Sequence, residues 1–173
     1  MKNLWTPWRM SYILGHEGRN SACIFDVTGN CLFDRERLIL YRDELSLVLL
    51  NRFPYANGHL LVAPARHLAE LVELDDTEAH RLMDMLGKST AILKKHLKPD
   101  GFNIGLNLGE TAGAGLADHL HFHIVPRWDG DHNFMATVAG IRLIPEELDR
   151  TFSRLLDDFQ ALTETEPISV CRP

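Results

Sequence analysis

The stretch His119-Leu120-His121-Phe122-His123-Ile124-Val125-Pro126-Arg127 alternates imidazole and apolar side chains with a period of two. This pattern is typical of a β-strand with one buried face. As a strand, it places His119, His121 and His123 on one side and the apolar residues on the other. Neighbours on one face lie roughly 6.5–7 Å apart, because a strand rises about 3.3 Å per residue. The three imidazoles would therefore each meet a different part of one extended ligand. Pro126 has no N–H to donate and is predicted to mark the end of the strand.

Three interpretations of this histidine triplet are open. It could be a solvated strand face, although nine histidines among 173 residues make a chance H-x-H-x-H rare. It could bind zinc, because alternating histidines on a strand can share one metal ion. It could also perform nucleophilic catalysis at phosphorus, which requires a neutral imidazole near pH 7, as the ordinary pKa of histidine permits.

Length and composition fit one globular domain with its own core. The chain is 45% hydrophobic and 24% charged, with a formal net charge of −6, so neither nucleic acid nor an anionic membrane is expected as a partner. A polyanionic ligand would have to be held by local donors. Three cysteines, an odd number, do not suit a secreted disulfide framework, and no apolar run is long enough for a signal peptide or a membrane span. A cytoplasmic location is expected.

The residues before the histidine stretch predict a sheet. Segments 37–42 and 45–50 form a hairpin, and a third strand covers 59–63 after a turn-rich connection. Segment 102–108 alternates again, with Phe102, Ile104 and Leu106 on one face. The loop 109–118 leads directly from this segment into the histidine strand, so antiparallel pairing is expected. Asn107 then shares the face of the imidazoles if the registers agree.

Two helices are predicted around the sheet. Asp75 and Glu78 offer a capping box at the start of the longer helix, and Pro99-Asp100-Gly101 stops it. Its apolar residues keep helical spacing at Ala79, Met83, Leu86, Leu93 and Leu97. A second amphipathic helix begins near Pro145 and carries Leu148, Phe152, Leu155, Leu156 and Phe159. The expected fold class is α+β, an antiparallel sheet with one long helix packed on it and a C-terminal helix.

The histidine triplet with its Ile-Val-Pro continuation resembles the signature of the histidine triad (HIT) superfamily of nucleotide hydrolases and transferases. Pro126-Arg127-Trp128 and the glycine-rich loop upstream are most similar to the Fhit-like and bacterial dinucleoside-polyphosphate phosphorylase members. The resemblance spans roughly residues 23–134. It implies one domain over residues 1–173, with an aromatic arm of about residues 1–22 and a C-terminal extension of about residues 128–173.

The resemblance also implies roles for four histidines. His121 would attack the α-phosphate through Nε2 and form a nucleotidyl-histidine, with its Nδ1–H held by a backbone carbonyl or a similar acceptor. His123 would contact phosphate oxygens, and His119 would support the strand or a zinc ion. His59 matches a fourth histidine beside the triad, although a buried structural histidine is the alternative.

Five further residues are candidate nucleotide contacts. In the loop 109–115, small side chains let backbone N–H groups approach an anion, so Gly113, Ala114 and Gly115 are the predicted phosphate cradle. Asn107 is a candidate side-chain donor. Asn51 matches a ribose-contacting position of the family, and a turn-capping role is the alternative.

The resemblance makes a nucleotide the expected substrate and a homodimer the expected assembly, with the aromatic arm as one contact. The resemblance implies no required cofactor. A structural zinc ion is a further possibility, although Asp26 stands where many relatives have the second cysteine of C-x-x-C; the ligands would be Cys23, Asp26, His67 and His119. Cleavage of dinucleoside polyphosphates such as diadenosine tetraphosphate is the leading hypothesis, with water or inorganic phosphate as acceptor. The alternatives are a nucleotide-binding regulatory homodimer with little turnover and a zinc-dependent hydrolase that uses the triplet as ligands.

Overall fold

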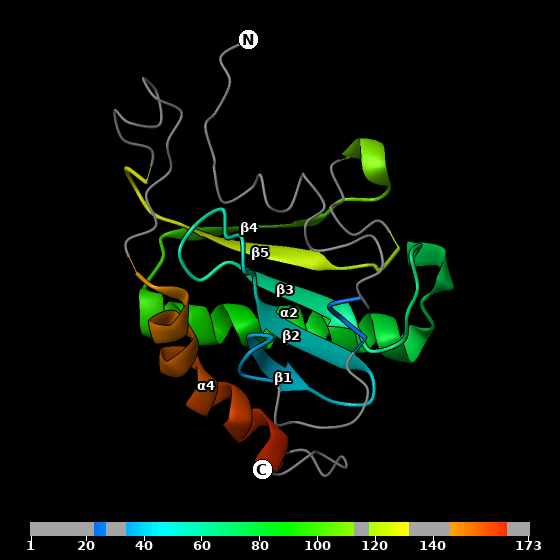
Figure 1. Cartoon of the computed structure of the whole chain (residues 1–173), viewed down its shortest axis with the longest axis horizontal. Helices are drawn as coiled ribbons and strands as arrows, with labels where there is room; N and C mark the ends of the chain where they lie inside the picture. Colours follow the sequence, from blue (N-terminus) through cyan, green and yellow to red (C-terminus); the bar gives the residue numbers. More distant parts are fainter. Residues whose placement is uncertain (1–22, 27–33, 113–117, 132–145, 166–173) are drawn as a thin grey trace.

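The computed structural model describes residues 23–26, 34–112, 118–131 and 146–165. Within these residues, aliphatic segments bounded by turns form β1 (Ile39–Arg42), β2 (Ser46–Leu50), β3 (Leu60–Pro64), β4 (Gly101–Leu106) and β5 (Phe122–Arg127). They make one antiparallel sheet with the order β1-β2-β3-β5-β4 (Figure 1). The histidine segment therefore leads into an interior strand.

Both predicted helices are present. In α2 (Asp76–Leu97), the Asp75 carboxylate accepts from the Glu78 N–H while the Glu78 carboxylate accepts from the Asp75 N–H, so the predicted capping box is confirmed. The helix ends at Lys98, which adopts a left-handed conformation. The C-terminal helix α4 (Leu148–Thr165) begins three residues after Pro145. Two short 3₁₀ turns, η2 (Leu71–Glu73) and η3 (Glu110–Ala112), were not predicted.

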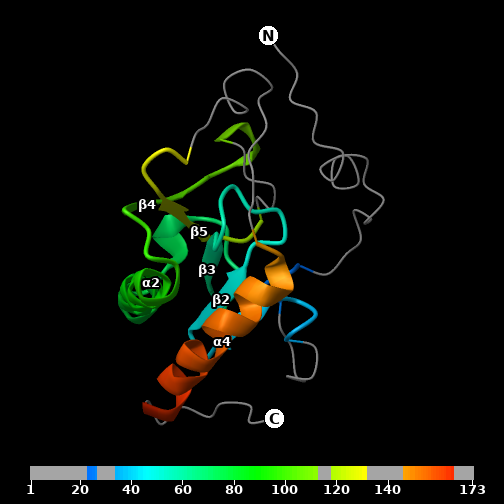
Figure 2. The ribbon, with the colours of Figure 1, turned by 90° about the vertical axis from the view of Figure 1, so that its left-hand side faces the viewer.

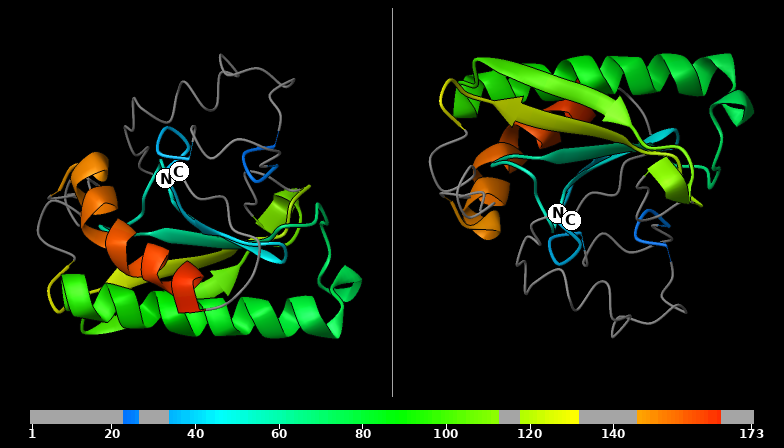
Figure 3. Two further views of the ribbon diagram at one scale, coloured as in Figure 1. Left: turned by 90° about the horizontal axis from the view of Figure 1, so that it is seen from below. Right: turned by 90° about the horizontal axis from the view of Figure 1, so that it is seen from above.

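The two helices pack on the same face of the sheet. Figure 2 shows α2 nearly end-on beside the strands, and Figure 3 shows α2 and α4 together on one side. Their apolar faces meet alternate residues of the strands in the main core, which includes Val48, Leu50, Leu60, Val62, Leu82, Met85, Leu93, Ile124, Phe152, Leu155 and Phe159. Met83 was predicted on the buried face of α2, but its side chain is 65% exposed. The buried stripe follows Leu82, Met85 and Leu86 instead.

The opposite face of the sheet carries a smaller core beside the histidines. It consists of Phe25, Ile39, Leu47, Leu49, Leu61 and Ala63. Leu61 is the partner of His123 in the β3–β5 ladder, and paired residues share a face. His123 therefore points to the face away from α2 and α4.

The strand that holds part of the triplet both begins and ends later in the chain than predicted. Strand β5 begins at Phe122, so His119 and His121 lie before its ladder. That preceding segment is held instead by the Leu120 N–H, which donates to the Leu68 carbonyl at 2.7 Å. Pro126 does not end the strand. The ladder with β3 stops at Ile124, so Pro126 has only β4 as a neighbour and needs no N–H toward β3.

Strand β4 is an edge of the sheet among the described residues. It pairs antiparallel with β5, as predicted, and Gly105 is opposite His123. Ile104 is 47% exposed on this strand, which has a strand neighbour on one side only. The predicted aromatic arm lies outside the described residues. No helix among the described ranges is long and apolar enough to span a membrane.

Candidate active site

Four histidines that the sequence predicted as site residues gather at one place on the sheet. His59, the residue immediately before β3, is fully buried, and His119 and His121 are buried in the segment leading to β5. The ring of His123 lies 5.0 Å from that of His121 and 5.2 Å from that of His59. The structure thus brings the fourth histidine into contact with the triplet across 64 residues of chain.

His121 is oriented by the backbone. Its Nδ1 lies 2.8 Å from the carbonyl oxygen of His119. A carbonyl can only accept, so Nδ1 carries the ring proton and Nε2 of the neutral imidazole keeps its lone pair. Burial lowers the pKa of His121, although the hydrogen bond to His119 acts in the opposite direction. At neutral pH the ring is therefore neutral, with a nucleophilic Nε2.

His59 and His123 form a direct imidazole pair. Nε2 of His59 lies 3.0 Å from Nδ1 of His123. Burial, together with the neighbouring His123 and His121, lowers the pKa of His59 to about 3. Burial and the proximity of His121 lower the pKa of His123 to about 4. Both rings are neutral at pH 7, so one proton lies between the two nitrogens that meet in this contact.

His119 faces away from this pair and toward the N-terminal segment. Its Nε2 donates to the carbonyl oxygen of Pro64 at 3.0 Å, and its Nδ1 lies 3.3 Å from Sγ of Cys23. The ring of Phe25 lies 4.8 Å from that of His119 and 5.1 Å from that of His121. The residue whose carbonyl holds His121 is therefore also in contact with the segment 23–26.

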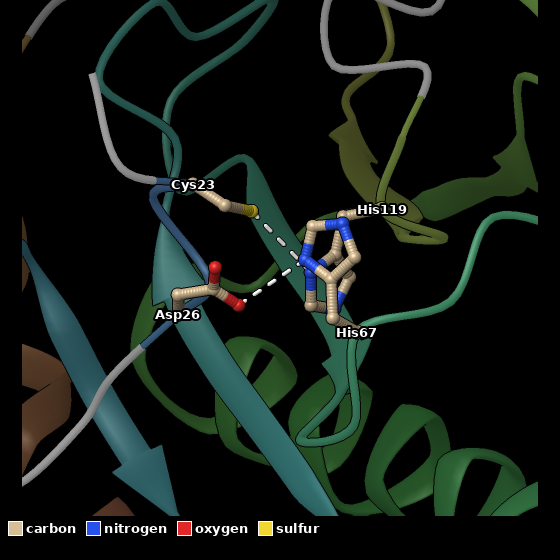
Figure 4. Close-up of side chains that lie close together, drawn as sticks. All are labelled: Cys23, Asp26, His67 and His119. Carbon is tan, nitrogen blue, oxygen red and sulfur yellow. Dashed lines mark hydrogen bonds and ion pairs between the residues drawn. The ribbon is translucent and has the colours of Figure 1, made fainter. Parts of the chain in front are cut away.

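Cys23, Asp26, His67 and His119 converge as a candidate metal centre (Figure 4). Their ligand atoms all lie within 4.8 Å of one another, and Nδ1 of His67 contacts the Asp26 carboxylate at 3.2 Å. The Pro64 carbonyl holds the proton of His119 on Nε2, so Nδ1 has a lone pair for a metal. One thiol, two imidazoles and one carboxylate are donors that zinc accepts, so the residues fit the ion.

Of the five predicted nucleotide contacts, the structure describes Asn51 and Asn107. Asn51 accepts the Phe53 N–H at 2.9 Å and directs its amide nitrogen toward Nδ1 of His59 at 3.3 Å. This turn-capping contact was the alternative interpretation of Asn51, and the ribose contact stays a prediction. Asn107 follows the last β4–β5 pair, Leu106 with Phe122, and so continues the register opposite His121. Gly113, Ala114 and Gly115 lie outside the described residues.

Two aromatic residues near the histidines were missed by sequence reasoning. The ring of Tyr55 lies 4.7 Å from that of His59 and stacks at 5.8 Å on that of His123. Phe25 covers His119 and His121, as described above. Both residues sit in short turn segments that also contain a named candidate, which was the available signal. The indole N–H of Trp128 donates to the Leu97 carbonyl at the end of α2.

The chain is similar to known proteins in both sequence and structure. The HIT domain family model matches residues 34–130. An AP-4-A phosphorylase of Mycobacterium tuberculosis is 41% identical over 162 residues, which cover 90% of this chain and 83% of that protein. A Zn-bound histidine triad family protein from Mycobacterium smegmatis has a similar structure, with a TM-score of 0.59, 27% identity, and coverage of 75% of this chain and 88% of that one. A hypothetical histidine triad nucleotide-binding protein from Sulfolobus tokodaii has a TM-score of 0.61 at 25% identity, with coverage of 81% and 93%.

Proposed function

The chain belongs to the HIT domain family, and from that premise we propose that it cleaves dinucleoside polyphosphates such as diadenosine tetraphosphate through a covalent nucleotidyl-histidine. The observation that carries this proposal is the hydrogen bond from Nδ1 of His121 to the His119 carbonyl. It leaves Nε2 unprotonated in a buried neutral ring, which is the form of imidazole that attacks phosphorus.

The proposed reaction has two displacements. Nε2 of His121 attacks the α-phosphorus, a P–N bond forms, and the P–O bond to the leaving polyphosphate breaks. The imidazole becomes positively charged, and the His119 carbonyl stabilises that charge through Nδ1–H. The oxygen of an acceptor then attacks the same phosphorus, and the P–N bond breaks to restore neutral His121. His123, beside His121, supplies a donor to the phosphate oxygens.

The acceptor is proposed to be inorganic phosphate. The relative that is 41% identical over most of both chains is named a phosphorylase, which supports phosphate over water. Incubation with diadenosine tetraphosphate and isotopically labelled phosphate tests this. Phosphorolysis gives ATP and an ADP that carries the label in its β-phosphate. Products free of label, such as AMP with ATP, would show hydrolysis and refute phosphate as the acceptor.

The nucleophile is tested by replacing one histidine at a time. His121→Asn should lower kcat by at least about a thousandfold, because the covalent intermediate cannot form. His123→Asn should lower it less, since this change removes a stabilising donor. His80→Asn, on the exposed face of α2, is the matched control and should keep full activity. A His121→Asn protein with most of its kcat would refute the covalent route.

The two alternative functions make different predictions. A regulatory nucleotide-binding homodimer would bind substrate without turnover, so a wild-type protein that binds diadenosine tetraphosphate and forms no product would support it. A hydrolase with zinc on the triplet would need His121 and His123 as ligands. The candidate metal centre found among the described residues takes only His119 from the triplet, which favours phosphate chemistry at the other two.

We also propose that Cys23, Asp26, His67 and His119 bind a structural zinc ion. When bound, zinc would tie the segment 23–26 to the segment that carries the His119 carbonyl. Metal analysis of the purified protein should give about one zinc per chain, and a chelator should lower the melting temperature. Asp26→Cys adds a second thiolate ligand, so this variant should keep its higher melting temperature in the presence of a weak chelator. A metal-free protein whose melting temperature does not respond to added zinc would refute the site.

The assembly is proposed to be a homodimer in the cytoplasm, formed along the β4 edge. Ile104 is exposed on this edge strand, and unpaired edges are ready templates for another strand. Ile104→Glu should convert the dimer to a monomer in sedimentation, because it places a charge at the contact. Met83→Glu, on the exposed face of α2, is the control that should remain dimeric. The reverse result would move the contact to the helix, and a monomeric wild-type protein would refute the dimer.

A further inference from the structure

The imidazole nitrogen of His123 that faces away from His59 has no hydrogen-bond partner among the described residues. This atom, Nε2, is buried, and its ring is held at Nδ1 by His59. A buried polar atom without a hydrogen-bond partner is costly, so a ligand group is expected to meet this nitrogen. The identity of the group at Nε2, a donor or an acceptor, depends on where the ring proton of His123 resides.

The proton position can be followed back along the chain of contacts to His59. Nδ1 of His59 lies 3.0 Å from the Tyr55 backbone nitrogen, which can only donate. It also lies 3.3 Å from the amide nitrogen of Asn51. The Asn51 side chain has a defined orientation, because its oxygen accepts the Phe53 N–H at 2.9 Å and its NH₂ must then point to His59. Two donors therefore meet at Nδ1 of His59, which must accept.

The remaining assignments follow from one proton per neutral ring. His59 carries its proton on Nε2 and donates it to Nδ1 of His123. Because Nδ1 of His123 accepts, the proton of that ring resides on Nε2. The buried nitrogen of His123 is thus an N–H donor. A phosphate oxygen is the acceptor that would satisfy it.

We propose that Asn51 is a positioning residue: together with the Tyr55 N–H, its amide donor acts through His59 to fix the tautomer of His123 and so makes the Nε2–H of His123 a donor to phosphate. The phosphate part of this inference rests on the proposed function, whereas the tautomers do not. A backbone hydrogen bond also joins the two ends of the segment 51–59, because the Asn51 N–H donates to the His59 carbonyl at 2.9 Å. The Asn51 amide keeps one N–H and one oxygen lone pair, so it can contact a ribose at the same time.

The test exchanges the donor of Asn51 for an acceptor. Asn51→Asp keeps the oxygen that accepts from Phe53 but turns a second oxygen toward Nδ1 of His59, which should then become protonated. Asn57→Asp is the matched control, because it adds the same charge to the same loop. The side chain of Asn57 contacts the Thr151 hydroxyl at 3.2 Å instead of the His59–His123 pair. In Asn57→Asp, the tautomers of His59 and His123 should therefore match those of the wild type.

Long-range ¹H–¹⁵N correlation spectra of the unliganded protein report which ring nitrogens are protonated. The wild type and Asn57→Asp should show an unprotonated Nδ1 in both His59 and His123, and Asn51→Asp should show a protonated Nδ1 in His59. In Asn51→Asp, kcat should fall at least tenfold with a smaller change in KM.

The outcomes separate the positioning role from the proposed function. A protonated Nδ1 of His59 in the wild type refutes the assignment without any variant, and an unchanged His59 in a folded Asn51→Asp protein also refutes it. Unchanged kcat despite the altered tautomer would show that the tautomer does not serve catalysis. Wild-type protein with the expected tautomers and an Asn51→Asp protein with the altered one, but no cleavage of diadenosine tetraphosphate by the wild type, would support the positioning by Asn51 and refute the proposed function instead.

Discussion

Gly58, the residue before His59, is the position where the structure gives the sharpest stability prediction. Its φ is +71°, a left-handed conformation that costs a residue with a Cβ about 1 kcal/mol. A Cβ added there would also lie 2.3 Å from Cδ1 of Leu97, far inside the usual carbon–carbon contact of about 3.5–4.0 Å. The Leu97 methyl would have to move by more than about 1 Å. Leu97 packs against the main core at the end of α2, and overpacking of this kind costs about 1–3 kcal/mol.

Gly58→Ala should therefore lower the free energy of unfolding by about 2–4 kcal/mol, the sum of the backbone and packing contributions. Gly130→Ala is the matched control. Its φ is also +71°, but no atom of the described residues lies within 4 Å of a Cβ added there, so only the backbone cost of about 1 kcal/mol applies. Urea denaturation at pH 7 measures both variants against the wild type.

The packing contribution can be isolated by a double-mutant cycle. Leu97→Ala removes the obstructing methyl groups, so the loss caused by Gly58→Ala should shrink by about 1 kcal/mol or more in the Leu97→Ala background. The reasoning is refuted if Gly58→Ala is no more destabilising than Gly130→Ala. A cycle without coupling would likewise show that Leu97 does not restrict position 58.

Three further predictions concern other parts of the fold. Burial lowers the pKa of His59 to about 3 and that of His123 to about 4, below the ordinary value, so from about pH 6.5 downward the unfolded chain binds protons that the folded chain does not. The contribution of these two histidines to the free energy of unfolding should be fully present at pH 7–8. The contribution of His59 alone should fall by about 2 kcal/mol between pH 7 and pH 5. Urea midpoints that do not change with pH over this range would contradict this prediction. Asp75→Ala removes the acceptor for the first turn of α2 and should cost about 1 kcal/mol in the same assay, whereas an unchanged midpoint would deny the cap a role. Arg81→Met leaves the fully buried Asp43 carboxylate without its guanidinium partner and should cost about 3 kcal/mol, and a loss below about 1 kcal/mol would show that the other donors to Asp43 suffice.

Several features of this protein were determined by local sequence. The alternation around His121 predicted a strand segment with a chemical face and an apolar face, and Phe122 and Ile124 do pack on the helix side. The capping box at Asp75 and the apolar spacing of the last helix also predicted their elements. These features depend on contacts within a few residues, because side-chain periodicity and helix capping are properties of consecutive positions. The family resemblance then predicted the four histidines that lie together in the candidate site.

The state of those histidines was decided only by the tertiary structure. The sequence predicted one strand face for the triplet, but His119 lies toward Cys23 and His67, while His123 pairs with His59 from a distant segment. Tautomers depend on which donors and acceptors meet each ring nitrogen, and these partners are backbone and amide groups far away in the sequence, such as the Pro64 carbonyl. Burial of the rings, which keeps them neutral, likewise requires the packed sheet. Periodicity in a sequence places an imidazole on a face, but only the folded chain determines which of its nitrogens holds the proton.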